Sequence, residues 1–203
     1  MSNALEMNVS SCSELLKKET KAIHKILESK LDFPDSYREL SSYSKILSIF
    51  FVFQRELESN LTAFEHLLPL GFDIQNRKHL HLIIKDIESL ETTESTLNKI
   101  KYEPLNFLSL SEMVGGLYVS EGSSLGGRII QKMMIQMHGI EIVKSVNYLN
   151  PYGDSTDSMW LQFKNIMDHE VELERFNPEQ VLIGAKKSFN LLVSLVDKAG
   201  IKL

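Results

Sequence analysis

The stretch GGLYVSEGSSLGGR, residues 115–128, decides the architecture that we expect for this chain. It carries five of the ten glycines of the sequence, inside a run that otherwise has the apolar spacing of a helix. Each glycine inside a helix costs about 1 kcal/mol relative to alanine, so five of them need a physical reason. Two reasons are open: a tight crossing by another helix, or a flat, bulky ligand lying against bare backbone.

The rest of the chain has helical periodicity as well, and it predicts an all-α domain of about seven or eight helices. Candidate strands at residues 116–119 and 140–143 have no neighbour with hairpin chemistry. We expect a flexible N-terminal tail over residues 1–12 and a single domain over residues 13–203. The predicted helices span residues 13–31, 35–68 (a break near Ser48 stays open), 76–90, 109–138, 156–171 and 177–199.

Composition excludes several classes of protein. A net charge of −5 gives no overall basic field for nucleic acid. The single cysteine, Cys12, cannot form an internal disulfide and favours a reducing compartment. No apolar run approaches the ~18 residues of a membrane span, and no signal peptide is visible. We therefore expect a cytoplasmic protein without a membrane anchor.

The first predicted helix carries a polar stripe beside its apolar one. Lys17, Lys21, His24 and Glu28 lie three or four residues apart, so they share a helix face. A Glu28 carboxylate that accepts the His24 Nδ1–H would leave Nε2 free to bind a metal. The two lysines would then neutralise carboxylates on the ligand that carries the metal. The alternative is a boundary histidine on a solvated helix face.

These two helices together suggest a binding site. A metal ligand on one helix and bare backbone on another would form the two walls of a slot for a metallated planar ring.

The residues of both helices resemble those of bacterial haem oxygenases. LKKETKAIHKILE, residues 16–28, resembles their proximal helix, and GLYVSEGSSLGG, residues 116–127, resembles their distal helix. Similarity continues at residues 152–153, 159–163 and 185–189, so it covers the chain from about residue 15 to residue 196. The resemblance implies a single-domain, all-α haem oxygenase-like fold, with haem between a proximal N-terminal helix and a kinked, glycine-rich distal helix.

The resemblance implies a role for each residue that matches the family's motifs. His24 would be the axial ligand of the haem iron, and Glu28 would be its hydrogen-bond partner. Gly122 and Gly126 would let the distal helix lie close over the ring, and Gly127 would ease its kink.

Further residues are implied at the edge of the ring and above it. Lys17 and Tyr118 match positions that hold haem propionates in relatives, with Lys21 beside them, and Phe189 would line the pocket. Ser123 stands where the eukaryotic branch has an aspartate that orders distal water. A water network held by Ser123, backbone groups and Ser124 would replace that carboxylate.

The activity implied is the oxidative opening of haem to biliverdin, CO and free iron, with haem as both cofactor and substrate. No flavin or iron–sulfur motif is visible, so electrons would come from a ferredoxin or a flavoprotein reductase. This donor would dock on a basic rim of Lys17, Lys21 and Lys132. A non-catalytic haem carrier on the same fold is the alternative function.

Two other classes fit the sequence less well. Residues 122–126 match the G-x-S-x-G motif of serine hydrolases, but that motif needs a preceding strand. Di-iron carboxylate bundles need Glu-x-x-His pairs, and no histidine here has a glutamate three residues before it. The remaining histidines are predicted to lie at the surface or the core boundary: His66, His79, His81, His138 and His169.

Overall fold

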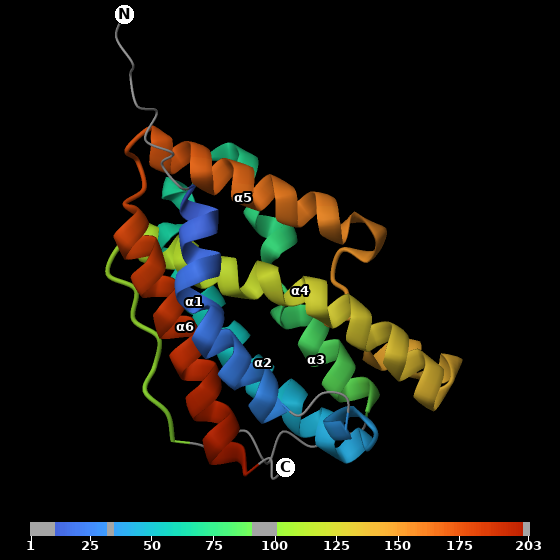
Figure 1. Cartoon of the computed structure of the whole chain (residues 1–203). Helices are drawn as coiled ribbons and strands as arrows, with labels where there is room; N and C mark the ends of the chain where they lie inside the picture. The colour runs from blue at the N-terminus through green and yellow to red at the C-terminus, as the bar shows by residue number, and fades with distance from the viewer. Residues whose placement is uncertain (1–10, 32–34, 91–100, 201–203) are drawn as a thin grey trace, which may run out of the picture.

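The computed structural model describes residues 11–31, 35–90 and 101–200, and these residues form a single all-α fold, as predicted (Figure 1). No strand occurs within these ranges. The helices are α1 (Cys12–Leu31), α2 (Leu40–Phe64), α3 (Leu80–Ser89), α4 (Leu110–His138), α5 (Thr156–Glu172) and α6 (Pro178–Ala199). Short 3-10 segments are η1 (Asp35–Tyr37), η2 (Glu65–Leu67), η3 (Leu70–Phe72), η4 (Ile74–Arg77), η6 (Ile140–Ser145) and η7 (Gly153–Ser155).

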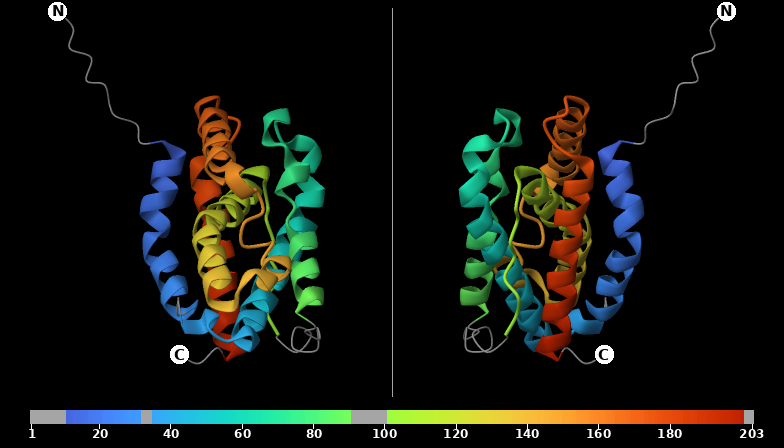
Figure 2. Two further views of the ribbon diagram at one scale, coloured as in Figure 1. Left: turned by 90° about the vertical axis from the view of Figure 1, so that its right-hand side faces the viewer. Right: turned by 90° about the vertical axis from the view of Figure 1, so that its left-hand side faces the viewer.

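The helices are arranged in three layers, which Figure 2 shows side by side. The glycine-rich helix α4 lies in the middle layer and packs most extensively against α6. Helix α1 forms one flank, where it contacts α6 and α5. Helices α2 and α3 form the opposite flank. None of the helices in the described ranges is both long and apolar enough to cross a membrane.

Local capping chemistry sets the ends of α4 and α6, as predicted. Ser109 Oγ accepts a hydrogen bond from the Glu112 amide at 3.2 Å, which caps the start of α4. Asn177 Oδ1 accepts from the amides of the first turn of α6, and Pro178 occupies its first position. Gly200, with φ of 60°, ends α6 in the left-handed conformation that glycine adopts without strain.

The start of α1 differs from the prediction. The helix begins at Cys12, which is buried, although residues 1–12 were expected to form the tail; residues 1–10 lie outside the described ranges. Ser11 Oγ caps this start by accepting the Glu14 amide at 3.3 Å, and the Asp168 carboxylate of α5 accepts hydrogen bonds from the Ser13 amide and the Ser13 hydroxyl, both at 2.7 Å. Asp168 lies 155 positions away from Ser13 in the sequence.

Two other predictions change in detail. Helix α2 continues through Ser48, whose hydroxyl donates to the Ser44 carbonyl at 2.9 Å within the helix. Within the described residues there are six α-helices instead of the predicted seven or eight, and short 3-10 segments take the other places. The candidate strand at residues 140–143 is part of η6.

Glycines allow the central crossing of α4 and α6. A Cβ atom on Gly184 would lie 1.8 Å from the Glu112 carbonyl oxygen, and one on Gly115 would lie 2.0 Å from the Val181 carbonyl oxygen. Because both neighbours are backbone atoms, no side-chain movement relieves these overlaps. The two helices can pack this closely only with glycine at both positions.

Candidate functional site

The five glycines of α4 fall into two groups. A Cβ atom on Gly115, Gly116 or Gly127 would overlap Val181, Phe107 or Leu149 respectively, at 2.0–2.6 Å. On Gly122 the nearest atom would be Trp160 at 3.6 Å, which is ordinary contact, and on Gly126 no atom lies within 4 Å. Tight packing therefore explains three of these glycines, whereas Gly126 leaves bare backbone beside open space and Gly122 has room for a Cβ atom in ordinary contact with Trp160.

His24 projects from α1 next to α6. Its side chain is 53% exposed, and its ring meets the Phe189 ring edge-on, with centroids 5.6 Å apart. Glu28 lies one turn later, with Oε1 3.8 Å from His24 Nε2, which is too long for a hydrogen bond. The nearer nitrogen is Nε2 and not the predicted Nδ1, because both side chains are largely exposed and little holds the ring in one orientation.

Helix α1 is held near its two ends. Ser13 is bonded to Asp168 of α5, and Lys30 pairs with Asp197 of α6. Lys17 and Lys21 lie between them and are exposed, two turns and one turn before His24. Within the described residues α1 makes few direct contacts with α4, although Figures 1 and 2 show α1 on the flank beside the middle layer that contains α4. The histidine and the open glycines thus lie on neighbouring helices that are not packed tightly together.

Tyr118 lies on the buried side of α4, at the N-terminal end of α1. Burial is the largest cause that raises the pKa of its hydroxyl to about 12, and Cys12 and Asp168 raise it further. The Tyr118 ring packs on Trp160, with centroids 5.2 Å apart. Tyr118 and the exposed Lys17 therefore both lie toward the N-terminal end of α1.

Two serines bond back onto the helix in the glycine-rich segment. Ser123 Oγ donates to the Ser120 carbonyl at 2.6 Å, and Ser124 Oγ donates to the Glu121 carbonyl at 2.7 Å. Such bonds to the preceding turn often bend helices, which fits the expected kink. Gly127 is buried beneath the backbone of Leu149, so the structure gives it a packing reason next to this segment.

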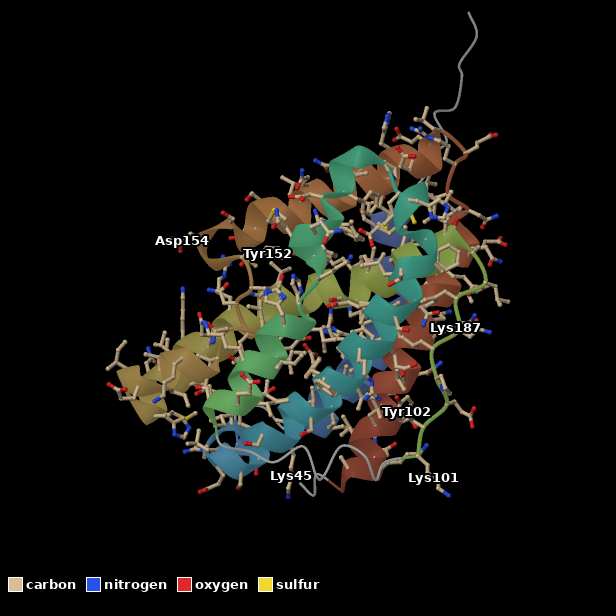
Figure 3. All side chains as sticks on the ribbon, turned by 180° about the vertical axis from the view of Figure 1, so that it is seen from behind. Lys45, Lys101, Tyr102, Tyr152, Asp154 and Lys187 are labelled. Carbon is tan, nitrogen blue, oxygen red and sulfur yellow. The ribbon has the colours of Figure 1, made fainter. Side chains whose placement is uncertain are left out.

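A buried polar network behind α4 was not predicted from the sequence. Arg77 Nη1 donates to Glu121 Oε2 at 2.5 Å, and both side chains are fully buried. Tyr152 donates to Glu121 Oε1 at 2.7 Å, and its hydroxyl lies 3.0 Å from His79 Nε2. Tyr152 is labelled in Figure 3, between the ribbons of α5 and α4. The network connects three segments of the chain at the residue that precedes Gly122.

Burial shifts the pKa values of this network in opposite directions. It raises the pKa of Glu121 to about 7, although Arg77 and Tyr152 oppose the shift, and it lowers the pKa of His79 to about 4. The prediction that His79 lies at the surface or the core boundary is wrong, because it is only 2% exposed. The sequence signal that could have revealed this network is Glu121, a charged residue inside the largely apolar run before Gly122.

The metal-binding side chains of the described residues suit an iron that takes its other ligands from a porphyrin. In the described part of the chain, no three His, Cys, Asp or Glu side chains lie close enough together to hold a metal ion. A haem iron needs only one axial side chain from the protein, and a half-exposed imidazole is a common choice. His24 meets this requirement.

Comparisons with known proteins agree with this geometry. The family model described as heme oxygenase matches residues 10–198. A search of curated proteins gives no match. The fold is similar to solved structures of heme oxygenase from Neisseria meningitidis (TM-score 0.69, 18% identity, 94% of this chain and 92% of that chain) and heme oxygenase 2 from Chlamydomonas reinhardtii (0.70, 14%, 95% and 99%).

A third similar structure is heme oxygenase from Leptospira interrogans (TM-score 0.68, 16% identity, 92% of this chain and 98% of that chain). At these identities the solved structures establish the fold, and the family model establishes membership across nearly the whole chain. The all-α fold also excludes the strand-dependent hydrolase alternative. The chain belongs to the haem oxygenase family, and it is a haem-degrading enzyme.

Proposed function

We propose that this enzyme binds haem between α1 and the open face of α4, with His24 as the iron ligand, and opens it to biliverdin, CO and free iron. One observation carries the proposal. A Cβ atom would meet nothing within 4 Å at Gly126 and only ordinary contact with Trp160 at Gly122, on the helix that neighbours α1, which carries the exposed His24. Neither glycine is needed for packing against another part of the protein, so a flat ligand supplies the missing reason.

The α1 side of the slot binds and orients the ring. His24 Nε2 is the ligand atom, which requires the imidazole to turn so that Nδ1–H points toward Glu28. Phe189 packs against the imidazole and fixes one edge of the pocket. Lys17 and Lys21, exposed in the N-terminal half of α1, neutralise the haem propionates, and the Tyr118 hydroxyl hydrogen-bonds them.

The α4 side of the slot leaves little room above the haem ring, and it places few polar side chains there. Gly122 and Gly126 let the backbone approach the ring, while Gly127 holds the bent segment beneath Leu149. Ser123 supplies a hydroxyl that holds distal water together with backbone groups and Ser124. Haem supplies the redox chemistry and is itself the group oxidised, whereas the protein supplies orientation, steric limits and hydrogen bonds.

Electrons come from a separate donor protein, a ferredoxin or a flavoprotein reductase. Lys17 and Lys21 are exposed on α1, and Lys132 is exposed on α4. Together they form a basic rim beside the slot for an acidic donor surface.

Haem titration of three proteins tests the ligand assignment. We expect wild type to bind haem with the spectrum of a histidine-ligated iron, and His24→Ala to lose that spectrum. His169→Ala is the matched control, because His169 is similarly exposed (63%) and lies 3.7 Å from a glutamate on its own helix. An unchanged spectrum in His24→Ala, or equal losses in both variants, would contradict the proposal.

Turnover of the haem complex separates the enzyme from a haem carrier. With ascorbate and O2, we expect the Soret band to disappear and a green bilin to form. A carrier would keep an intact Soret band under the same conditions.

A further inference from the structure

One buried hydroxyl beside the glycine-rich segment has no hydrogen-bond partner. Tyr148 is 7% exposed, and its hydroxyl oxygen meets no donor or acceptor in hydrogen-bond geometry among the described residues. A buried hydroxyl without a partner costs free energy, so such groups usually have a reason. The only other buried side-chain polar atom without a partner in the described ranges is Ser188 Oγ on α6.

Tyr148 is held firmly in this position. The Tyr148 amide donates to buried Asp86 at 2.8 Å, and the Asn147 amide donates to the same carboxylate at 2.9 Å. The Tyr148 ring packs on Phe50, with centroids 5.6 Å apart. The next residue, Leu149, presses its carbonyl onto Gly127 of α4. The loop therefore fixes the Tyr148 side chain against α4.

Ser123 is the hydroxyl close to Tyr148. Ser123 and Gly127 are four residues apart on one face of α4, the face that this loop covers. Burial raises the pKa of Tyr148, and the Ser123 side chain acts in the opposite direction, as a nearby hydrogen-bonding group does. The Ser123 proton is directed at the Ser120 carbonyl, and Ser123 Oγ keeps lone pairs that can accept another bond.

The polar groups around this pair are already satisfied. Ser120 Oγ donates to Gln54 Oε1 at 3.1 Å, and Gln54 Nε2 donates to Glu58 Oε1 at 3.0 Å. The Glu58 carboxylate also accepts the Leu80 amide at 2.8 Å. Ser123 can change the acceptor of its hydroxyl proton by a single rotation about its Cβ–Oγ bond.

We propose that Tyr148 is a positioning residue that acts through Ser123. When haem is bound, the Tyr148 hydroxyl donates to Ser123 Oγ, and the Ser123 proton turns from the Ser120 carbonyl toward the open face at Gly122 and Gly126. The buried tyrosine then has its partner, and the serine becomes a donor directed at the open face. This inference rests on the proposed function, since it needs haem on that face.

Fluoride binding to the ferric haem complex tests this role, because fluoride binds iron on its open side and accepts hydrogen bonds. We expect Tyr148→Phe to weaken fluoride binding about fivefold to tenfold, the value of one hydrogen bond. Ser123→Ala should weaken it at least as much. The double variant should bind fluoride no more weakly than Ser123→Ala alone, because Tyr148 acts through that serine.

A second readout uses the haem-free protein. Tyr148→Phe removes a hydroxyl without a partner, so the melting temperature should stay the same or rise by about 2–4 °C. Ser188→Ala is the control for fluoride binding: it removes the other buried hydroxyl without a partner and should leave fluoride affinity unchanged.

Several results would overturn the role of Tyr148. These are an unchanged fluoride affinity in Tyr148→Phe, additive losses in the double variant, an equal loss in Ser188→Ala, or a lower melting temperature of haem-free Tyr148→Phe. Any of them with a normal histidine-ligated spectrum in wild type contradicts this inference and leaves the proposed function standing. A wild-type protein that does not form that spectrum contradicts both.

Discussion

Two groups of glycines on α4 serve opposite purposes. At the packed glycines, Gly115, Gly116 and Gly127, neighbouring atoms lie where any side chain would overlap them, and Glu121 in the same helix is locked to Arg77. The open glycines, Gly122 and Gly126, share a helix face with Gly115 but lie further along α4, and a Cβ atom there would overlap no neighbour. The protein therefore packs one group of glycines tightly and leaves the other bare. Tight packing around the rest of α4 lets the exposed glycine segment keep its shape beside a ligand, so little conformational freedom is lost on binding.

The largest effect on stability is expected at the packed glycines. Gly115→Ala places a Cβ atom 2.0 Å from the Val181 carbonyl oxygen and 2.7 Å from the Ala185 amide nitrogen, so α4 and α6 must separate. We expect a loss of about 5 kcal/mol or more in the free energy of unfolding, measured by chemical denaturation. A stable Gly115→Ala variant with native helicity would remove the contrast between the packed and the open glycines.

The buried ion pair behind the open face comes next. Arg77→Met leaves Glu121 buried without its cation, and we expect a loss of about 3–5 kcal/mol in the free energy of unfolding at pH 8. The loss should be smaller at pH 5.5, where Glu121 is neutral. Adding Glu121→Gln to Arg77→Met should recover part of the stability. No recovery in the double variant would show that the pair does not act as a unit.

The same network predicts opposite pH dependences from its two titrating members. Glu121 has a raised pKa of about 7, so its contribution to stability is present below about pH 4.5 and is lost as pH rises through 7. His79 has a lowered pKa of about 4, so the unfolded chain takes up its proton first, and its contribution grows from about pH 4 to 6.5.

Denaturation at several pH values separates these two contributions. The stability of wild type minus that of Glu121→Gln should fall by about 2 kcal/mol between pH 5 and pH 7.5. The stability of wild type minus that of His79→Gln should rise between pH 4 and pH 6.5. Flat differences in both cases would mean that burial does not shift these groups as described.

The smallest effect on stability is expected on the open face. Gly126→Ala meets no atom within 4 Å and improves helix propensity, so the free energy of unfolding should rise by about 0.5–1 kcal/mol. Haem affinity should fall about tenfold, because a methyl group of repulsive contact is worth about 1–3 kcal/mol. Unchanged haem affinity would place the ring away from this face.

Features encoded by neighbouring residues were predictable, and features made by distant residues were not. Ser109, Asn177 and Gly200 act on their own helix ends, so α4 and α6 matched the expected boundaries. The start of α1 was placed one residue late: Ser11 caps it locally, and Asp168, far away in the sequence, accepts from Ser13. The glycine cluster was visible, but its division into packed and open members required the neighbours in space.

The candidate site shows the same limit. His24, Lys17 and Lys21 share a face of α1 and stand out from spacing alone. Arg77 and Tyr152 approach Glu121 from two other segments and His79 reaches Tyr152, and nothing in the local sequence of any one of them marks this meeting. Tyr148 stands out only because its hydroxyl lacks a partner in the folded, described part of the chain.

The iron–histidine stretching band in the resonance Raman spectrum of the ferrous haem complex tests the central claim most directly. The account predicts this band in wild type, its loss in His24→Ala, and its return when imidazole is added to that variant. A band that persists in His24→Ala without imidazole would contradict the account, because another side chain would then hold the iron.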